Sequence, residues 1–273
     1  MAFRKTEAIT IYQKDYSESS QIITFYTKDY GKITLLARGV YRAKHRTLSP
    51  PDLFSYNEIV FLERFPQGIN LLTEITIKDN FPYLRLDLER LNRAFYIAEF
   101  LIELTEPAES NRELFDLVLK TIRQLSFSLN NSRDKEEIAI FSFEAQALKY
   151  LGYMPNTFCC VICGKVTDNY KVAFSLYNGS FICSDCRNKH PNRILQFTNA
   201  LPFNRKMANQ LHNNDLLEVS AGVMKLMHIL SNPFLPDLER LKITKSMQSE
   251  LRNFIKKYIA YITGKEFNAM KLS

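Results

Sequence analysis

Four cysteines occur in two pairs with the spacing of a metal site. Two residues separate Cys160 from Cys163, residues 164–182 follow, and Cys183 and Cys186 repeat the spacing. This separation lets both thiolates of a pair bind one tetrahedral ion at ~2.3 Å, and the second pair completes a Cys₄ set. Four thiolates leave no coordination position for water. The pattern therefore predicts one structural zinc ion rather than a catalytic one.

The segment between the pairs is typical of a zinc ribbon. Residues 172–182 have the pattern of a β-hairpin that turns at Asn178-Gly179, and Gly164 follows the first pair where a tight turn favours glycine. Two further metal-binding side chains lie nearby and rank below the pairs. Cys159 is adjacent to the first pair but out of step with it, and His190 lies past the second pair.

A basic stretch at residues 31–46 has the composition of a polyanion-binding segment. No acidic residue interrupts it, and its side chains can meet phosphates with their charge and a base with an aromatic ring. A solvated surface loop rich in lysine and arginine is the alternative interpretation. The net charge of +7 and the pI of about 9.0 favour anionic partners. The candidate nucleic-acid-binding residues are Lys32, Arg38, Tyr41, Arg42, Lys44 and Arg46.

Catalytic motifs are absent from the sequence. It contains no G-x-x-x-x-G-K-[ST] phosphate loop, no G-x-G-x-x-G, no G-x-S-x-G elbow and no H-x-E of a zinc deaminase. The acidic residues between 87 and 103 fall on a predicted helix, where they are expected to be solvated. The sequence therefore predicts a binding protein and not an enzyme.

The basic stretch belongs to a region in which apolar residues alternate with a period of two. Strands are predicted at 8–12, 21–27, 33–37, 58–63 and 69–77. In the last of them, Ile69, Leu71, Ile75 and Ile77 are expected to share the buried face. Five short strands without an intervening helix favour an OB-fold barrel over a barrel of another topology.

After residue 80 the apolar residues recur every three to four positions. Helices are predicted at 84–104, 110–125, 134–150, 203–212, 215–230 and 245–263, the second opening with a capping box formed by Ser110 and Glu113. The predicted class is α+β multidomain. Its parts are an OB-fold barrel at 1–80, a helical bundle at 81–157 and 191–273, and a zinc ribbon inserted into the bundle at 158–190.

The N-terminus turns charged before any apolar run starts, and no segment approaches the ~18 apolar residues of a membrane span. A cytoplasmic protein with reduced thiols is expected.

The order of these features resembles the RecO family of bacterial recombination mediators. The similarity lies in residues 7–11, in 19–33 with the turn Gly31-Lys32, in the strand exit Ala37-Arg38-Gly39, and in Leu71-Leu72-Thr73-Glu74. The cysteine pairs after three helices and the basic C-terminal helix also fit. Cys159 is a departure, since the family usually has a small or polar residue there.

The resemblance implies a non-catalytic, nucleoid-associated DNA-repair factor. Members of the family bind single- and double-stranded DNA, anneal complementary strands, associate with RecR and the C-terminal tail of single-stranded-DNA-binding protein, and help to load RecA during gap repair. Two other classes of protein stay open at this point. One is a protein-interaction adaptor that is stabilised by zinc and does not bind DNA, and the other is a metal-dependent hydrolase or nuclease.

Overall fold

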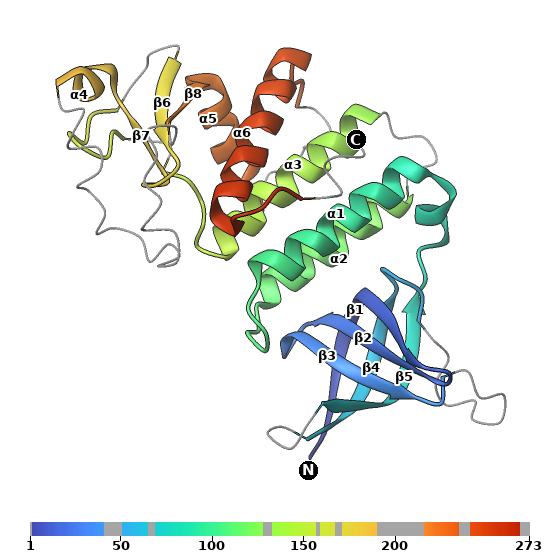
Figure 1. Ribbon diagram of the computed structural model, residues 1–273. Coiled ribbons are helices and arrows are strands. Elements are labelled where there is room, and N and C mark those ends of the chain that lie inside the picture. The colour runs from blue at the N-terminus through green and yellow to red at the C-terminus, as the bar shows by residue number, and fades with distance from the viewer. Residues whose placement is uncertain are drawn as a thin grey trace. The chain divides into compact units, whose positions relative to one another are not determined.

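The computed structural model describes residues 2–40, 51–64, 69–127, 133–156, 159–166, 171–189, 216–234 and 241–267. The chain divides into two compact units, one formed by residues 1–132 with 267–273 and the other by 133–266 (Figure 1). The division into three domains at 1–80, 81–157 with 191–273, and 158–190 stays a prediction. Within the described ranges, no helix is both long and apolar enough to span a bilayer.

The first unit begins with a closed five-stranded barrel (Figure 1). The strands follow each other around it in the order β1-β2-β3-β5-β4, and β3 and β5 pair in parallel while the other pairs are antiparallel. The predicted OB-like barrel is confirmed. Its strands are β1 (Ala2–Ser17), β2 (Ser20–Thr27), β3 (Gly31–Arg38), β4 (Tyr56–Glu63) and β5 (Asn70–Asp79).

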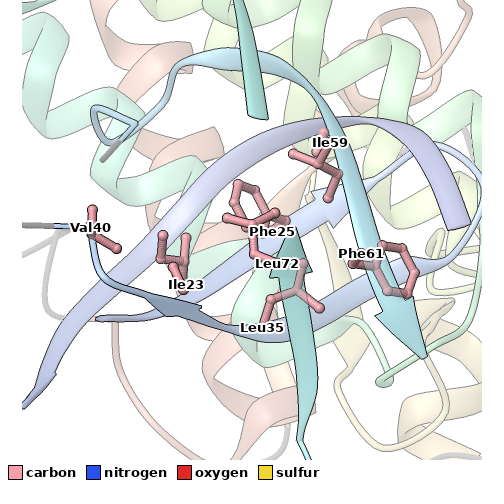
Figure 2. Packing of buried hydrophobic residues seen from close by; sticks show 9 residues of the cluster. Ile23, Phe25, Leu35, Val40, Ile59, Phe61 and Leu72 are labelled. Atoms are coloured by element: carbon pink, nitrogen blue, oxygen red, sulfur yellow. The ribbon is translucent and has the colours of Figure 1, made fainter. Parts of the chain in front are cut away.

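The barrel interior is filled by side chains from all five strands. Figure 2 shows Ile23, Phe25 and Leu35 directed to the same interior as Ile59 and Phe61. Burying such side chains stabilises the fold by roughly 1.5–3 kcal/mol each. The remaining buried members of the cluster are Ala8, Ala37, Val40 and Leu72.

A β-bulge overturns the predicted face of β5. Val60 pairs with Glu74, but the next residue, Phe61, pairs with Leu72, which leaves Thr73 as an extra residue. The side-chain alternation shifts at this point, so that Leu72 and Ile75 face the core. The prediction of one buried face was therefore wrong at both ends, since Ile69 and Ile77 are 42% and 39% exposed. A bulge depends on how two strands pair, which a single strand's sequence does not reveal.

Two long helices complete the first unit after the short 3₁₀ helix η1 (Pro82–Leu86). In α1 (Leu88–Leu104), the Asp87 side chain accepts hydrogen bonds from the first backbone N–H groups. In α2 (Arg112–Phe127), the Asn111 side chain accepts from the N–H of Leu114 at 2.9 Å. The predicted capping box was therefore displaced by one residue, because asparagine, an equally good cap, lies next to Ser110.

The second unit combines helices with a small three-stranded sheet of order β7-β6-β8. The ring of Phe174 from the sheet contacts Phe254 and Tyr258 of the last helix at centroid distances of 4.9 and 5.6 Å. The elements are α3 (Arg133–Tyr150), β6 (Lys171–Ser175), β7 (Ser180–Ile182), α4 (Ser184–Lys189), β8 (Leu216–Ser220), α5 (Ala221–Leu230) and α6 (Lys245–Thr263).

One predicted helix of this unit is partly a strand. Helix 215–230 was predicted as continuous, yet Leu216–Ser220 pairs with β6, and the helix starts only at Ala221. Ser220 ends the strand and caps the helix, its hydroxyl accepting from the N–H of Val223. The predicted helices at 134–150 and 245–263 are confirmed. The helix predicted at 203–212 lies outside the described residues.

Candidate metal centre and nucleic-acid face

The four paired cysteines converge on one point of the second unit. The sulfur atoms of Cys160, Cys163, Cys183 and Cys186 all lie within 4.8 Å of one another. The first pair sits in a tight turn in which the N–H of Gly164 donates to the carbonyl of Cys160 at 2.9 Å and Gly164 takes a positive φ of 70°. The second pair spans the start of α4. The predicted ligand set is thus brought together by two separate turns.

Backbone N–H groups favour the thiolate of Cys160, whereas burial raises the pKa values of the Cys183 and Cys186 thiols. The N–H of Cys183 points at the sulfur of Cys160, and the N–H of Cys186 at the sulfur of Cys183, both at 3.4 Å. Burial raises the pKa of the Cys160 thiol, but N–H groups led by that of Cys183 outweigh burial and lower the pKa to about 7. Four thiolates in this arrangement are a donor set for a soft metal ion in tetrahedral geometry.

Among the described residues, Cys159 lies outside this cluster. The side-chain amide of Asn156 lies 3.7 Å from the sulfur of Cys159, and the backbone of Cys159 bridges to Val166. His190, the other spare ligand candidate, lies outside the described residues. Among the described thiols, Cys159 is therefore the one set apart from the cluster.

Lys32, at the start of β3, points its ammonium group at the end of α1. The ammonium donates hydrogen bonds to the backbone carbonyls of Ile102 and Thr105, the latter at 2.6 Å. Burial lowers the pKa of Lys32. The Lys32 carbonyl in turn accepts from the N–H of Ala108 at 3.0 Å, so the strand and the end of the helix are joined on two sides. The same close approach explains Gly31, where a Cβ would lie 2.0 Å from the carbonyl oxygen of Glu109.

Arg38 lies at the other end of β3 and is exposed. Within the described ranges it takes part in no ion pair. Lys32 and Arg38 thus lie at opposite ends of one strand and are not brought together. The other four predicted DNA-binding residues, Tyr41, Arg42, Lys44 and Arg46, lie outside the described residues.

Four other cations of the barrel are neutralised by carboxylates, whereas Arg64, just past β4, takes part in no ion pair among the described residues. Lys5 contacts Glu58 at 2.7 Å, and Lys28 contacts Glu7 at 3.0 Å. Arg4 and Lys78 are paired in the same way, with Glu63 and with both Glu7 and Glu58. These pairs reduce the charge that Arg4, Lys5, Lys28 and Lys78 can offer to an anion.

The sequence analysis missed Lys14, which resembles Arg38 in being exposed and in having no carboxylate partner in the described part of the barrel. Lys14 lies beyond the predicted strand 8–12, next to residues 15–19, which have the polar composition of a turn. The structure extends β1 to Ser17 and pairs it with β2 along this stretch. The period-two recurrence of Tyr12, Lys14 and Tyr16 was the available signal for a longer strand.

Two family models match the chain. The model described as "Recombination protein O N terminal" matches residues 1–81, and that described as "Recombination protein O C terminal" matches residues 85–201. A relative from Rhodopirellula baltica, named DNA repair protein RecO, is 32% identical over 205 residues, which cover 74% of each chain. The chain belongs to the RecO family.

Other RecO proteins match over similar or greater lengths. One from Desulforamulus reducens is 27% identical over 266 residues, covering 97% of this chain and 92% of the relative. One from Halalkalibacterium halodurans is 33% identical over 190 residues, covering 70% and 71%. Both carry the name DNA repair protein RecO, so the resemblance found in the sequence is confirmed and places the chain among DNA repair proteins.

Proposed function

We propose that this RecO family chain is a non-catalytic recombination mediator that binds and anneals single-stranded DNA. The observation that carries the proposal is the uneven neutralisation of the barrel. Arg4, Lys5, Lys28 and Lys78 are paired with carboxylates, whereas the exposed Arg38 and Lys14 have no such partner among the described residues. Arg64, just past β4, also lacks an ion pair there, but its side chain is partly buried. Unpaired cations bind phosphates without first breaking an ion pair.

The proposed DNA contacts are Arg38 and the residues that follow it, Tyr41, Arg42, Lys44 and Arg46. Annealing needs no chemistry at such a surface, since cations screen two phosphate backbones and lower the repulsion between complementary strands. The engagement of the Lys32 ammonium by two carbonyls favours a structural role for that residue over the predicted DNA contact.

We propose that the cysteine cluster binds one structural zinc ion through Cys160, Cys163, Cys183 and Cys186. The convergent sulfurs and the N–H groups directed at them support this assignment. When bound, zinc would hold the two turns of the ribbon together, and four protein ligands leave no position for a reacting water.

The proposed partners are those of the family: single- and double-stranded DNA, RecR and the C-terminal tail of single-stranded-DNA-binding protein. With RecR, the chain would help to load RecA at gaps in the nucleoid of the cytoplasm. Membership of the RecO family supports this part of the proposal.

Strand annealing by the wild type and by the triple variant Arg38→Ala/Arg42→Ala/Arg46→Ala tests the proposal. We expect the variant to anneal labelled complementary oligonucleotides much more slowly, with unchanged thermal stability. Unchanged annealing would refute the assignment of these residues. The alternative, a zinc-stapled adaptor, predicts no saturable binding of an oligonucleotide by the wild type. A nuclease predicts cleavage products with divalent metal, and we expect none.

A further inference from the structure

We propose that Cys163 is a site of oxidative modification, at which a peroxide drives formation of a disulfide with Cys183 and release of the zinc ion. This inference rests on the proposed zinc centre and deepens it, because it gives the four ligands unequal roles. Cys160 and Cys186 would only hold the ion, whereas Cys163 and Cys183 would be the pair that an oxidant removes.

Cys163 is the accessible member of the cluster. Its residue is exposed. The other three are buried, with exposed fractions of 1% for Cys160, 8% for Cys183 and 7% for Cys186. The space beside Cys163 is open as well, because a Cβ atom added at the neighbouring Gly164 would meet no atom of the described residues within 4 Å. Oxidants react with the thiolates that they can reach. A peroxide in solution therefore meets Cys163 before the other ligands.

Hydrogen bonding separates the ligands in the same way. The sulfurs of Cys160 and Cys183 each accept a backbone N–H at 3.4 Å. Such donors draw charge from a thiolate and make it a weaker nucleophile. No backbone N–H of the described residues donates to the sulfur of Cys163. The most accessible of the four sulfurs is therefore also one that lacks this protection.

A second thiol lies close enough to complete a disulfide. The sulfur of Cys163 is 3.7 Å from the sulfur of Cys183, which belongs to the other pair. A disulfide bond is about 2.05 Å long, so the two sulfurs need to approach by less than about 2 Å. Gly164 and Lys165, which follow Cys163 in the first turn, are exposed, and this turn can supply the movement. Because Cys183 is buried, it reaches the oxidised sulfur of Cys163 and not the peroxide itself.

The reaction has two steps, in which atoms and electrons balance. In the first, the thiolate of Cys163 attacks one oxygen of hydrogen peroxide, the O–O bond breaks, and a sulfenic acid and hydroxide form. In the second, the thiolate of Cys183 attacks the sulfur of the sulfenic acid, the S–S bond forms, and the S–O bond breaks to release a second hydroxide. Two thiolates lose two electrons in all, and the peroxide takes them up.

Zinc release follows from the loss of two thiolates. The thiolate is the form of cysteine that binds a metal, and two remaining ligands do not make the four-coordinate site of a structural zinc ion. The ribbon would stay together, because the disulfide joins the same two turns. In addition, the N–H of Val161 donates to the carbonyl of Phe181 on β7 at 3.1 Å. Reduction of the disulfide would therefore rebuild the site.

Cys159 provides the matched control. It is partly exposed and adjacent in sequence to the first pair, yet it lies outside the cluster, with its sulfur beside the side-chain amide of Asn156. Its oxidation would leave all four ligands in place. A response that needs a thiol of the cluster should therefore not depend on Cys159.

The test uses the zinc-loaded full chain and hydrogen peroxide, with a chromogenic chelator to follow zinc release and mass spectrometry to map disulfides. We expect the wild type to release its zinc ion as a disulfide forms between Cys163 and Cys183, and a dithiol reductant with added zinc to restore the starting state. Cys159→Ser should release zinc at the wild-type rate. Cys163→His keeps a ligand for zinc but removes the reactive sulfur, so its release should be at least about tenfold slower.

A second measurement needs no variant. Dimedone traps sulfenic acids, and in the wild type we expect the trapped group at Cys163 before any other ligand. The disulfide map and the trapped group decide the question if Cys163→His does not retain zinc.

Release from Cys163→His at the wild-type rate, a disulfide between other cysteines, or a sulfenic acid trapped first at another ligand would overturn the proposal. If the wild type holds zinc and keeps it in peroxide, the oxidative modification alone fails. If the wild type cannot be loaded with zinc, the proposed zinc centre fails with it.

Discussion

Replacing Lys32 by alanine tests whether its ammonium group stabilises the fold or binds DNA. The change removes an ammonium that donates to the carbonyls of Ile102 and Thr105 at the end of α1. A hydrogen bond from a charged donor contributes about 1.5–3 kcal/mol. Because Lys32 is only partly buried, solvent screening reduces that value, and the carbonyls can regain water. We therefore expect a loss of about 2 kcal/mol in unfolding free energy for the two bonds together.

For a unit of this size that loss corresponds to a fall in Tm of about 5 °C, measurable by circular dichroism. The salt dependence of DNA binding should stay at the wild-type slope. Arg38→Ala should do the opposite, leaving Tm nearly unchanged and reducing the log–log salt slope on single strands by about 0.7. Lys5→Ala removes an equal charge from an exposed, ion-paired position and serves as the control. A slope reduction for Lys32→Ala equal to that for Arg38→Ala would refute this reasoning.

Three further predictions follow from contacts in the two units. Glu7 accepts hydrogen bonds from Tyr56, Lys28 and Lys78, which lower its pKa to about 2. Its contribution to stability is therefore complete above pH 4.5 and is lost as the pH falls through 2. Glu7→Gln should therefore lower the unfolding free energy by about 1 kcal/mol at pH 7. Below pH 3 the urea midpoint of the variant should approach that of the wild type. A difference between the two midpoints that stays constant with pH would contradict this. Cys183→Ser should abolish zinc binding, measured by metal analysis, and lower the unfolding temperature of the second unit without altering the first; full zinc occupancy would exclude Cys183 as a ligand. Gly31→Ala should destabilise more than Gly39→Ala, because both have positive φ but only the new Cβ at Gly31 would collide with the Glu109 carbonyl; equal losses would argue against the close approach.

The sequence patterns predicted the parts of the fold that depend on local regularity. Period-two alternation located the five strands, and the helix ending at Gly264 follows from a glycine that adopts a positive φ of 76° there. The cysteine spacing predicted a cluster because two short turns each fix two thiols, whichever way the rest of the unit folds. These features are set within a few residues of chain.

The errors arose where pairing between distant segments decides the outcome. The bulge at Thr73 exists only because β4 and β5 pair, and the bulge at Ile11 only because β1 continues along β2. Lys32 looks like any other basic residue in sequence, yet the close approach of residues 102–109 occupies its ammonium. The balance of charge on the barrel was equally hidden, since Lys5 and Glu58 become partners only across β1 and β4.

The salt dependence of single-strand binding tests the central claim most directly, that DNA lies on the barrel face whose cations lack carboxylate partners. The double variant Lys14→Ala/Arg38→Ala is compared with Lys5→Ala/Lys28→Ala, which removes the same charge from ion-paired positions. We predict that the first variant loses about 1.4 from the log–log slope, at roughly 0.7 per phosphate contact, while the second keeps the wild-type slope. Equal slopes for the two variants would contradict the account.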